Sequence, residues 1–153
     1  MIMDISTTSG RVRAWLDMHL VDHGAVRAVY SNFYDLGGGM YRSSQPSPAQ
    51  LRKYQQSLGL RSVINLRGAH GYGSYALEKE ACEQLGLALH DVKLYSRTPP
   101  EVEEVHAMDT LFKTIEYPAL LHCKSGADRA GLGAALYRIL HLGHRVEDAM
   151  EEL

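Results

Sequence analysis

The chain has 153 residues, of which 45% are hydrophobic and 22% are charged, and its formal net charge is −2. This length and composition predict a single folded domain over residues 1–153 and exclude a disordered chain. A slightly negative chain has no general attraction for nucleic acid or an anionic membrane, so neither is an expected partner. No apolar run reaches the roughly 18 residues of a membrane-spanning helix.

Residues 1–59 predict a helix, a hairpin and a second helix. Residues 11–30 are predicted to form a helix that becomes looser through His23 and Gly24. Four apolar residues at helical spacing are expected to pack on one side of it: Val12, Trp15, Leu16 and Leu20. Residues 30–43 predict a hairpin that turns at 37–39, because three consecutive glycines stand there. A capping box at 47–50 then opens a helix that Gly59 ends.

From residue 62 onwards, predicted strands alternate with predicted helices. Strands are expected at 62–66, 88–94 and 117–121. A glycine-rich loop at 68–74 leads into a helix that ends at Gly86, and a capping box at 98–101 opens a helix that runs to about residue 115. A further helix at 127–142 ends at Gly143, and another begins at 146. The chain stops at Leu153 within an amphipathic pattern, which is compatible with a truncated C-terminus.

This alternation predicts an α/β fold, in which helices flank a central, mostly parallel sheet on both faces. Ligands in such sheets bind beyond the carboxyl ends of the strands. The expected strand at 117–121 leads directly to Cys123, so this cysteine should stand at such an end, where a helix begins.

Residues 122–131 read His-Cys-Lys-Ser-Gly-Ala-Asp-Arg-Ala-Gly, with five residues between Cys123 and Arg129. The amide groups of a tight loop and the N-terminus of the next helix form an anion site, whose field favours a thiolate over a thiol. A guanidinium such as that of Arg129 can grip two phosphate oxygens at once. The segment therefore predicts a phosphate-binding loop with a nucleophile; its expected phosphate ligands are Lys124, Ser125, Gly126, Ala127, Asp128 and Arg129.

The same segment resembles the C-x5-R signature loop of the protein tyrosine phosphatase superfamily, in its small dual-specificity-like branch. The stretches at 40–46 (Met-Tyr-Arg-Ser-Ser-Gln-Pro) and 62–68 (Ser-Val-Ile-Asn-Leu-Arg-Gly) also resemble that branch, particularly its bacterial members. The likeness covers most of the chain. It implies a phosphomonoesterase that forms a cysteinyl-phosphate on Cys123 and needs no metal or other cofactor. Its substrates would be phosphotyrosine, phosphoserine or phosphothreonine in proteins, small phosphate esters, or phosphoinositides.

Two aspartates compete for the role of general acid, which must protonate the leaving oxygen. Asp91 lies 32 residues before Cys123, a separation similar to that in many dual-specificity phosphatases, but it falls inside a predicted strand. The loop at 95–98, which should carry a mobile acid, contains no carboxylate. Several bacterial and lipid-directed relatives carry an aspartate at the position of Asp128, and a neighbouring thiolate and phosphate favour its protonated form. We favour Asp128, with Asp91 as the alternative. Without a catalytic role, Asp128 would be a cap of the following helix and Asp91 would be a solvated strand residue.

Residues near the loop can have either a role in the reaction or a purely structural one. In relatives, a histidine at the position of His122 is thought to help stabilise the thiolate, but it could equally be a core residue. Lys124 suits a polyanionic substrate, since relatives that act on phosphoinositides tend to carry lysine there; it could equally be solvated. For Arg67 we expect a structural ion pair rather than a place in the crevice.

Ala130 departs from the family pattern, which places serine or threonine directly after the signature arginine. That hydroxyl stabilises the departing thiolate, and the loss of such a hydrogen bond costs about 1.5–3 kcal/mol, or one to two decades in rate. Turnover is therefore expected to be slow, unless Ser125 or a water takes the place of that hydroxyl. A weakly active or inactive phosphate-binding module is the main alternative function, and a rhodanese-like sulfurtransferase is disfavoured because its loop is typically one residue shorter.

Two cysteines, Cys82 and Cys123, are too few for a disulfide scaffold, and this usage favours the cytoplasm. Cys82 lies in a helical pattern and is expected to be a packing residue, although some related phosphatases protect an oxidised nucleophile by a disulfide to a second cysteine. The eight histidines are scattered, without the spacing of a metal site. The sequence leaves the oligomeric state open.

Overall fold

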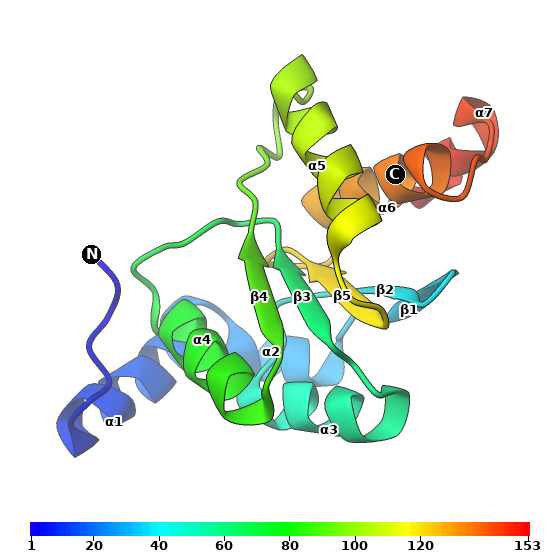
Figure 1. Cartoon of the computed structure of the whole chain (residues 1–153). Coiled ribbons are helices and arrows are strands. Elements are labelled where there is room, and N and C mark those ends of the chain that lie inside the picture. Colours follow the sequence, from blue (N-terminus) through cyan, green and yellow to red (C-terminus); the bar gives the residue numbers. More distant parts are fainter.

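The structure, a computed structural model, describes residues 1–153 apart from the side chain of Ala28. Its centre is a five-stranded sheet in the order β1-β2-β5-β3-β4 (Figure 1). β1 (Tyr34–Gly37) and β2 (Met40–Ser43) form an antiparallel hairpin. β5 (Ala119–His122), β3 (Ser62–Asn65) and β4 (Ala88–Asp91) run parallel to β2. The predicted mostly parallel α/β fold is therefore confirmed.

Helices cover both faces of the sheet (Figure 1). α3 (Pro48–Leu58) and α4 (Gly73–Leu85) lie on one face, and α5 (Val102–Thr114) and α6 (Asp128–Leu140) lie on the other. At the N-terminus, α1 (Thr8–Leu16), a π-helical turn η1 (Asp17–Val21) and α2 (Gly24–Val29) follow one another, and α1 packs on α4. At the other end, α7 (Val146–Ala149) and a 3-10 turn η2 (Met150–Glu152) pack on α6. Among the described residues, no helix is long and apolar enough to cross a membrane.

β5 is the central strand, and all four of its residues are buried. Its alternate side chains enter two different apolar cores, as the pleat of a strand requires. Leu121 packs with Phe112 of α5 and Tyr137 of α6. Leu120 packs with Leu51 of α3 on the other face. This two-sided burial fixes the end of β5, from which the chain enters the segment around Cys123.

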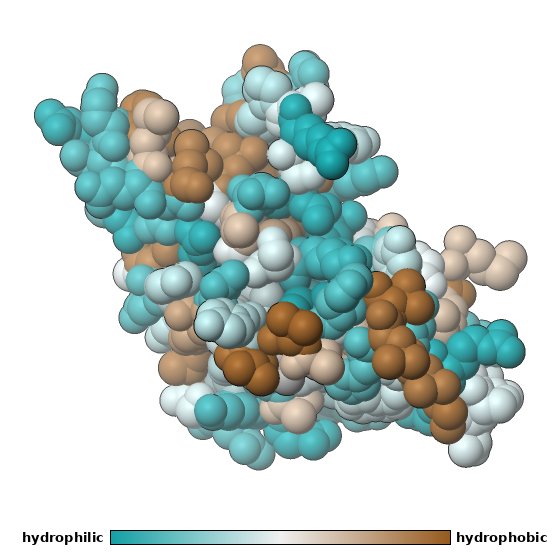
Figure 2. All heavy atoms as spheres, turned by 180° about the vertical axis from the view of Figure 1, so that it is seen from behind, coloured by the Kyte–Doolittle hydropathy of each residue, from teal (hydrophilic) through white to brown (hydrophobic). Residues whose placement is uncertain are grey.

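The N-terminal helix departs from the prediction. Instead of one helix, the structure has three short segments; the break at His23, whose φ is +59°, falls where the looser stretch was predicted. The four apolar side chains that were expected to pack against the protein are exposed; Leu20, for example, is 73% exposed. Ala14 and Met18 face the protein instead, packed against Leu77 of α4. Exposed apolar side chains gather in a stripe on the side where this segment lies (Figure 2).

Most predicted helix ends agree with the structure. Ser47 and Gln50 form the predicted capping box of α3, which ends at Gly59. The cap of α5 is different: the helix starts at Val102, and Glu101 with Glu104 forms its capping box. The prediction placed this box at 98–101, which would make Pro99 the first helical residue; Pro99 precedes Pro100, and a residue that precedes proline is disfavoured in the helical conformation.

Candidate active site

Residues 123–127 form the loop that joins β5 to α6, at the carboxyl edge of the central strand. Cys123 is 2% exposed and lies at the base of this loop. The backbone N–H of Gly126 donates to the Cys123 sulfur over 3.2 Å. The loop thus curls around the sulfur, and a thiolate there would accept this hydrogen bond.

Donors from neighbouring segments bind the carbonyl oxygens of the loop from behind. The side-chain amide of Asn32 donates to the Ser125 carbonyl over 2.7 Å, and the guanidinium of Arg42 donates to the Gly126 carbonyl over 3.0 Å. Arg42 is itself fixed by an ion pair with Glu152 of 2.7 Å. A tight loop whose carbonyls point outward turns its N–H groups inward, and such a concave set of N–H groups binds anions.

Gly126 is required by both its conformation and its surroundings. Its φ is +77°, in the left-handed region that favours glycine, and an added Cβ would lie 2.6 Å from the backbone nitrogen of Ser44. The N–H of Gln45 donates to the Lys124 carbonyl over 3.2 Å. The segment after β2 therefore lies directly against the loop and fixes its curvature.

A pocket of about 370 Å³ opens above Cys123. The loop lines it with Lys124 and Ser125, and the first turn of α6 contributes Asp128 and Arg129. These predicted site residues are thus brought together around the sulfur. Their chemical roles stay predictions.

The remaining walls of this pocket come from the loop at 95–98, which the sequence singled out as the place for a mobile acid, and from the N-terminal segment, which it did not connect with the site. His23, Val26 and Arg27 line it from the N-terminal segment, and Ser96 lines it from the loop after β4. Arg27 is only 7% exposed, so it is part of the structure rather than a free surface cation. The N-terminal segment is thus a wall of the candidate active site.

Asp91, the alternative acid, is placed elsewhere. The residues that line the pocket in the described part of the chain include Asp128 but not Asp91. Both carboxylate oxygens of Asp91 are already bonded: the Asn65 side chain donates over 2.8 Å and the Tyr75 hydroxyl over 2.5 Å. The geometry therefore favours Asp128 as the group that can reach a leaving oxygen.

Asp22 is a fully buried carboxylate at the centre of a cationic cluster. Arg67 donates to both of its oxygens, over 2.8 and 3.1 Å, and the Ser74 hydroxyl donates over 2.6 Å. Lys124 and Arg27 complete the cluster at 3.2 and 3.3 Å. Burial opposes ionisation, but the hydrogen bonds from Arg67 and Ser74 outweigh it and hold the pKa of Asp22 well below its usual range.

This cluster confirms that Arg67 makes a structural ion pair, and it fixes Lys124. The Lys124 side chain is 42% exposed, so it faces the pocket while Asp22 anchors it. One carboxylate here faces three cations, which leaves an excess of positive charge beside the loop.

A chain of buried side chains continues from Arg67 to the nucleophile. Arg67 donates to Gln45 over 2.9 Å, and Gln45 donates to Glu78 over 2.9 Å. The second oxygen of Glu78 lies 2.6 Å from Nε2 of His122. The other ring nitrogen of His122 is 3.3 Å from the carbonyl oxygen of Cys123.

Sequence reasoning missed Glu78, although α4 carried a signal for it. Ala81 and Cys82 are on the side of this helix that faces the protein interior. Glu78 lies three and four residues before them, on the same side of the helix, and has no exposed surface. A carboxylate in an apolar repeat requires a polar partner, but the sequence does not show that His122, 44 residues later, supplies it.

Cys82 is a packing residue, as predicted. Both thiols are free in the described part of the chain, and they belong to apolar cores on opposite faces of the sheet. Burial raises the pKa of Cys82 to about 12, so it is a poor nucleophile. The arrangement does not support a protective disulfide between Cys82 and Cys123.

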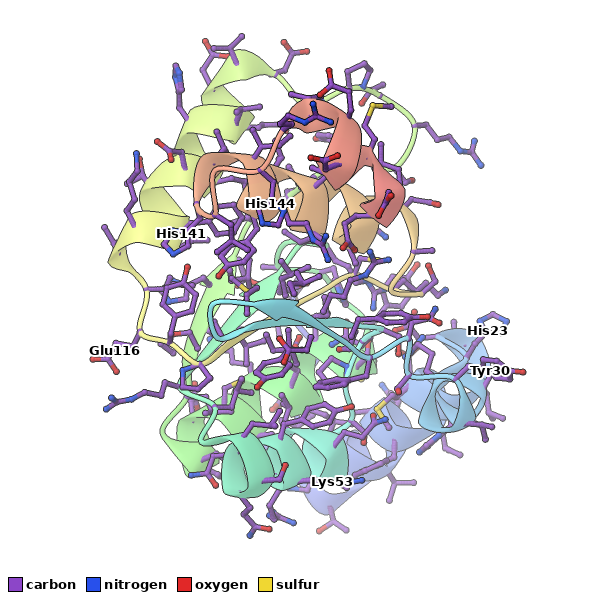
Figure 3. The ribbon with its side chains drawn as sticks, turned by 90° about the vertical axis from the view of Figure 1, so that its right-hand side faces the viewer. His23, Tyr30, Lys53, Glu116, His141 and His144 are labelled. Atoms are coloured by element: carbon purple, nitrogen blue, oxygen red, sulfur yellow. The ribbon has the colours of Figure 1, made fainter. Side chains whose placement is uncertain are left out.

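The histidines are dispersed over the molecule. His23 lies on the N-terminal segment, whereas His141 and His144 lie near the end of α6, at the opposite side of the view in Figure 3. Within the described residues, no three His, Cys, Asp or Glu side chains are grouped so that they could hold a metal ion.

Comparison with known proteins gives the family. Residues 28–147 match the model of the tyrosine phosphatase family. The dual specificity protein phosphatase TpbA of Pseudomonas aeruginosa is 29% identical over 126 residues, which cover 80% of this chain and 53% of that protein. The inositol diphosphatase DSP3 of Arabidopsis thaliana is 33% identical over 128 residues, which cover 76% of this chain and 58% of that protein.

Solved structures share the fold. The crystal structure of P. aeruginosa TpbA aligns with a TM-score of 0.61 and 23% identity, covering 80% of this chain and 71% of that one. The core catalytic domain of the PP-IP phosphatase SIW14 from S. cerevisiae, in complex with citrate, aligns with a TM-score of 0.60 and 19% identity, covering 80% and 84%.

The chain therefore belongs to the tyrosine phosphatase family, which confirms the resemblance drawn from its motifs. It spans little more than half the length of the curated relatives that it matches. Residues 1–27, which include Asp22 and line part of the pocket, precede the segment that matches the family model.

Proposed function

We propose that this chain is a cysteine-dependent phosphomonoesterase, with Cys123 as nucleophile, Arg129 as phosphate ligand and Asp128 as general acid. The observation that carries this proposal is the loop itself: it curls around a buried sulfur, and side chains from outside hold its carbonyls away from the centre. This arrangement suits a phosphate whose oxygens accept hydrogen bonds from the amides while the sulfur lies below the phosphorus.

In the first step, the Cys123 thiolate attacks phosphorus in line with the ester oxygen. An S–P bond forms and the P–O ester bond breaks, and the leaving oxygen takes a proton from the Asp128 carboxyl group. Arg129 and the loop amides bind the three equatorial oxygens, on which the negative charge of the transition state is spread.

In the second step, water hydrolyses the cysteinyl-phosphate. The Asp128 carboxylate accepts a proton from the water as its oxygen bonds to phosphorus, and the S–P bond breaks to return the thiolate. Ala130 is fully buried behind the loop and cannot donate a hydrogen bond to that thiolate. This step is therefore expected to be the slower one.

Hydrolysis of 4-nitrophenyl phosphate by wild type and Cys123→Ser tests the proposal. Turnover should require Cys123, whereas vanadate or inorganic phosphate should still bind to the variant, because the amides and Arg129 remain. Chelating agents should leave the wild-type rate unchanged. Turnover by Cys123→Ser at the wild-type rate would exclude the covalent route.

The names of the relatives suggest two substrate classes. One relative is a dual specificity protein phosphatase and another is an inositol diphosphatase. The excess of cations around Asp22 supports a substrate with more negative charge than one phosphate. A panel of phosphotyrosine, phosphoserine and phosphothreonine peptides and inositol phosphates, compared by kcat/KM, separates these classes.

A phosphate-binding module with little turnover is the second candidate. Two observations favour it: Ala130 stands after the signature arginine, and the loop at 95–98 offers Ser96, not a carboxylate, to the pocket. Tight binding of a phosphopeptide or inositol phosphate by the wild type, without release of phosphate, would support this function over catalysis.

A further inference from the structure

The last turn of the chain, η2, lies against α6, the helix that follows the loop around Cys123 (Figure 1). A Cβ on Gly131, in the first turn of α6, would lie 2.6 Å from the carbonyl oxygen of Glu152, so the two segments are in direct contact. Glu152 lies beyond residue 147, where the match to the family model ends. That match therefore assigns no role to Glu152.

Both carboxylate oxygens of Glu152 bind guanidinium groups. Oε2 lies 2.7 Å from Arg42, and Oε1 lies 2.6 Å from Arg138. Arg42 also donates to the main-chain carbonyl of Glu152 over 3.0 Å. The side chains of Arg42 and Glu152 are only 10% and 12% exposed, so water and salt screen their attraction weakly.

Arg42 connects this ion pair to the loop around Cys123. Its second terminal nitrogen donates to the Gly126 carbonyl over 3.0 Å. The peptide bond between Gly126 and Ala127 is trans, so the carbonyl of one and the N–H of the other point in opposite directions. The Ala127 N–H lies 3.4 Å from the hydroxyl of Ser125, a residue that lines the pocket. A guanidinium that holds the Gly126 carbonyl outward therefore directs the Ala127 N–H toward the pocket.

The position of Arg42 depends on the charge of Glu152. Among the described residues, Arg42 makes its one ion pair with Glu152, and its Nε has no hydrogen-bond partner. A hollow of about 430 Å³ adjoins Arg42 and gives the guanidinium room to move. A buried cation without a counter-charge is strongly unfavourable, so without the Glu152 carboxylate the guanidinium should turn into this hollow and release Gly126.

We propose that Glu152 is a positioning residue: through Arg42 it keeps the Ala127 N–H directed at a bound phosphate, and it thereby raises the affinity of the loop for oxyanions. The inference rests on the proposed function, which supplies the identity of the anion. It adds the C-terminal turn to the segments that the candidate active site requires.

Calorimetric titration with vanadate tests the proposal without any turnover. Glu152→Gln keeps the shape of the side chain but removes its charge. The variant should bind vanadate about tenfold more weakly than wild type, because one N–H no longer donates to the anion. Equal affinity in the two proteins would overturn this proposal alone. A wild type that does not bind vanadate would contradict the proposed function, and this proposal with it.

Two neighbouring residues provide matched controls. Arg138→Gln removes the other partner of Glu152 but leaves the contact between Arg42 and the loop, so it should lower the melting temperature and leave vanadate affinity unchanged. Glu151→Gln changes an exposed carboxylate in the same turn and should alter neither quantity. If Arg138→Gln loses as much affinity as Glu152→Gln, the turn acts only by packing on α6 and the proposal is wrong.

Arg42→Lys tests the same contact, should Glu152→Gln fail to fold. A lysine keeps a cation beside Glu152, but it lacks the planar fork that binds the carboxylate and the Gly126 carbonyl together. Its vanadate affinity should also fall about tenfold, and the double variant Arg42→Lys/Glu152→Gln should lose no more than either single variant. Unchanged affinity in Arg42→Lys, or losses that add in the double variant, would refute the proposed route through Arg42.

Discussion

The substitution Asp128→Asn tests which carboxylate supplies the proton. Asn keeps the shape of the side chain but cannot deliver a proton to a leaving oxygen. Asp128 lies in the first turn of α6, where an acidic side chain stabilises the helix by about 0.3–1 kcal/mol. The variant should therefore stay folded, so that its kinetics can be interpreted.

The size of the effect should depend on the leaving group. General acid catalysis contributes about 10²–10⁴ in rate, equivalent to about 3–5 kcal/mol of barrier. We expect an alkyl phosphate to lose at least about 100-fold in kcat/KM. 4-Nitrophenyl phosphate, whose leaving group needs little protonation, should lose less than about tenfold.

Asp91→Asn is the matched comparison. An amide at residue 91 cannot accept hydrogen bonds from both Tyr75 and Asn65, and the loss of one such bond costs about 1 kcal/mol of stability. Stability should fall slightly, while the ratio of alkyl to aryl rates should stay that of the wild type. If Asp91→Asn changes this ratio and Asp128→Asn does not, the assignment of the acid is wrong.

Three further substitutions examine the loop and its support. Gly126→Ala should lower kcat at least tenfold and weaken vanadate binding, because the added Cβ would meet the Ser44 backbone at 2.6 Å; normal binding would contradict the loop geometry. Asp22→Asn should lose about 3–5 kcal/mol at neutral pH, since Arg67 is then buried without a counter-charge. The lowered pKa of Asp22 stabilises the fold fully above about pH 4 and progressively less as the pH falls, so the urea midpoint of wild type should drop steeply below pH 4 and that of Asp22→Asn should not. Ala130→Ser should speed hydrolysis of the intermediate about tenfold, measured as the steady-state rate after a burst.

The fold could be predicted because its signals are local. The turn at 37–39, the capping box at Ser47 and the helix-ending Gly86 each act within a few residues, and the structure agrees at all three. The loop at 123–129 was predictable for the same reason: its amides, cysteine and arginine are consecutive in the chain.

The rest of the site depends on contacts between distant segments. Leu20 was expected to be buried because its spacing with other apolar residues is helical. Periodicity does not say which side of a helix meets the protein, and in the structure Ala14 and Met18 make that contact instead. Asp22 and Glu78 were missed because their partners lie 45 and 44 residues away, at Arg67 and His122. A single sequence shows such residues only as polar groups in apolar surroundings.

Isolation of the phosphorylated enzyme tests the central claim most directly. Wild type mixed with an aryl phosphate and quenched in acid should carry one phosphoryl group, located by peptide mass spectrometry on Cys123, and slow hydrolysis beside Ala130 should make it abundant. Steady release of phosphate with an unmodified Cys123, or with the phosphoryl group on another residue, would contradict the account.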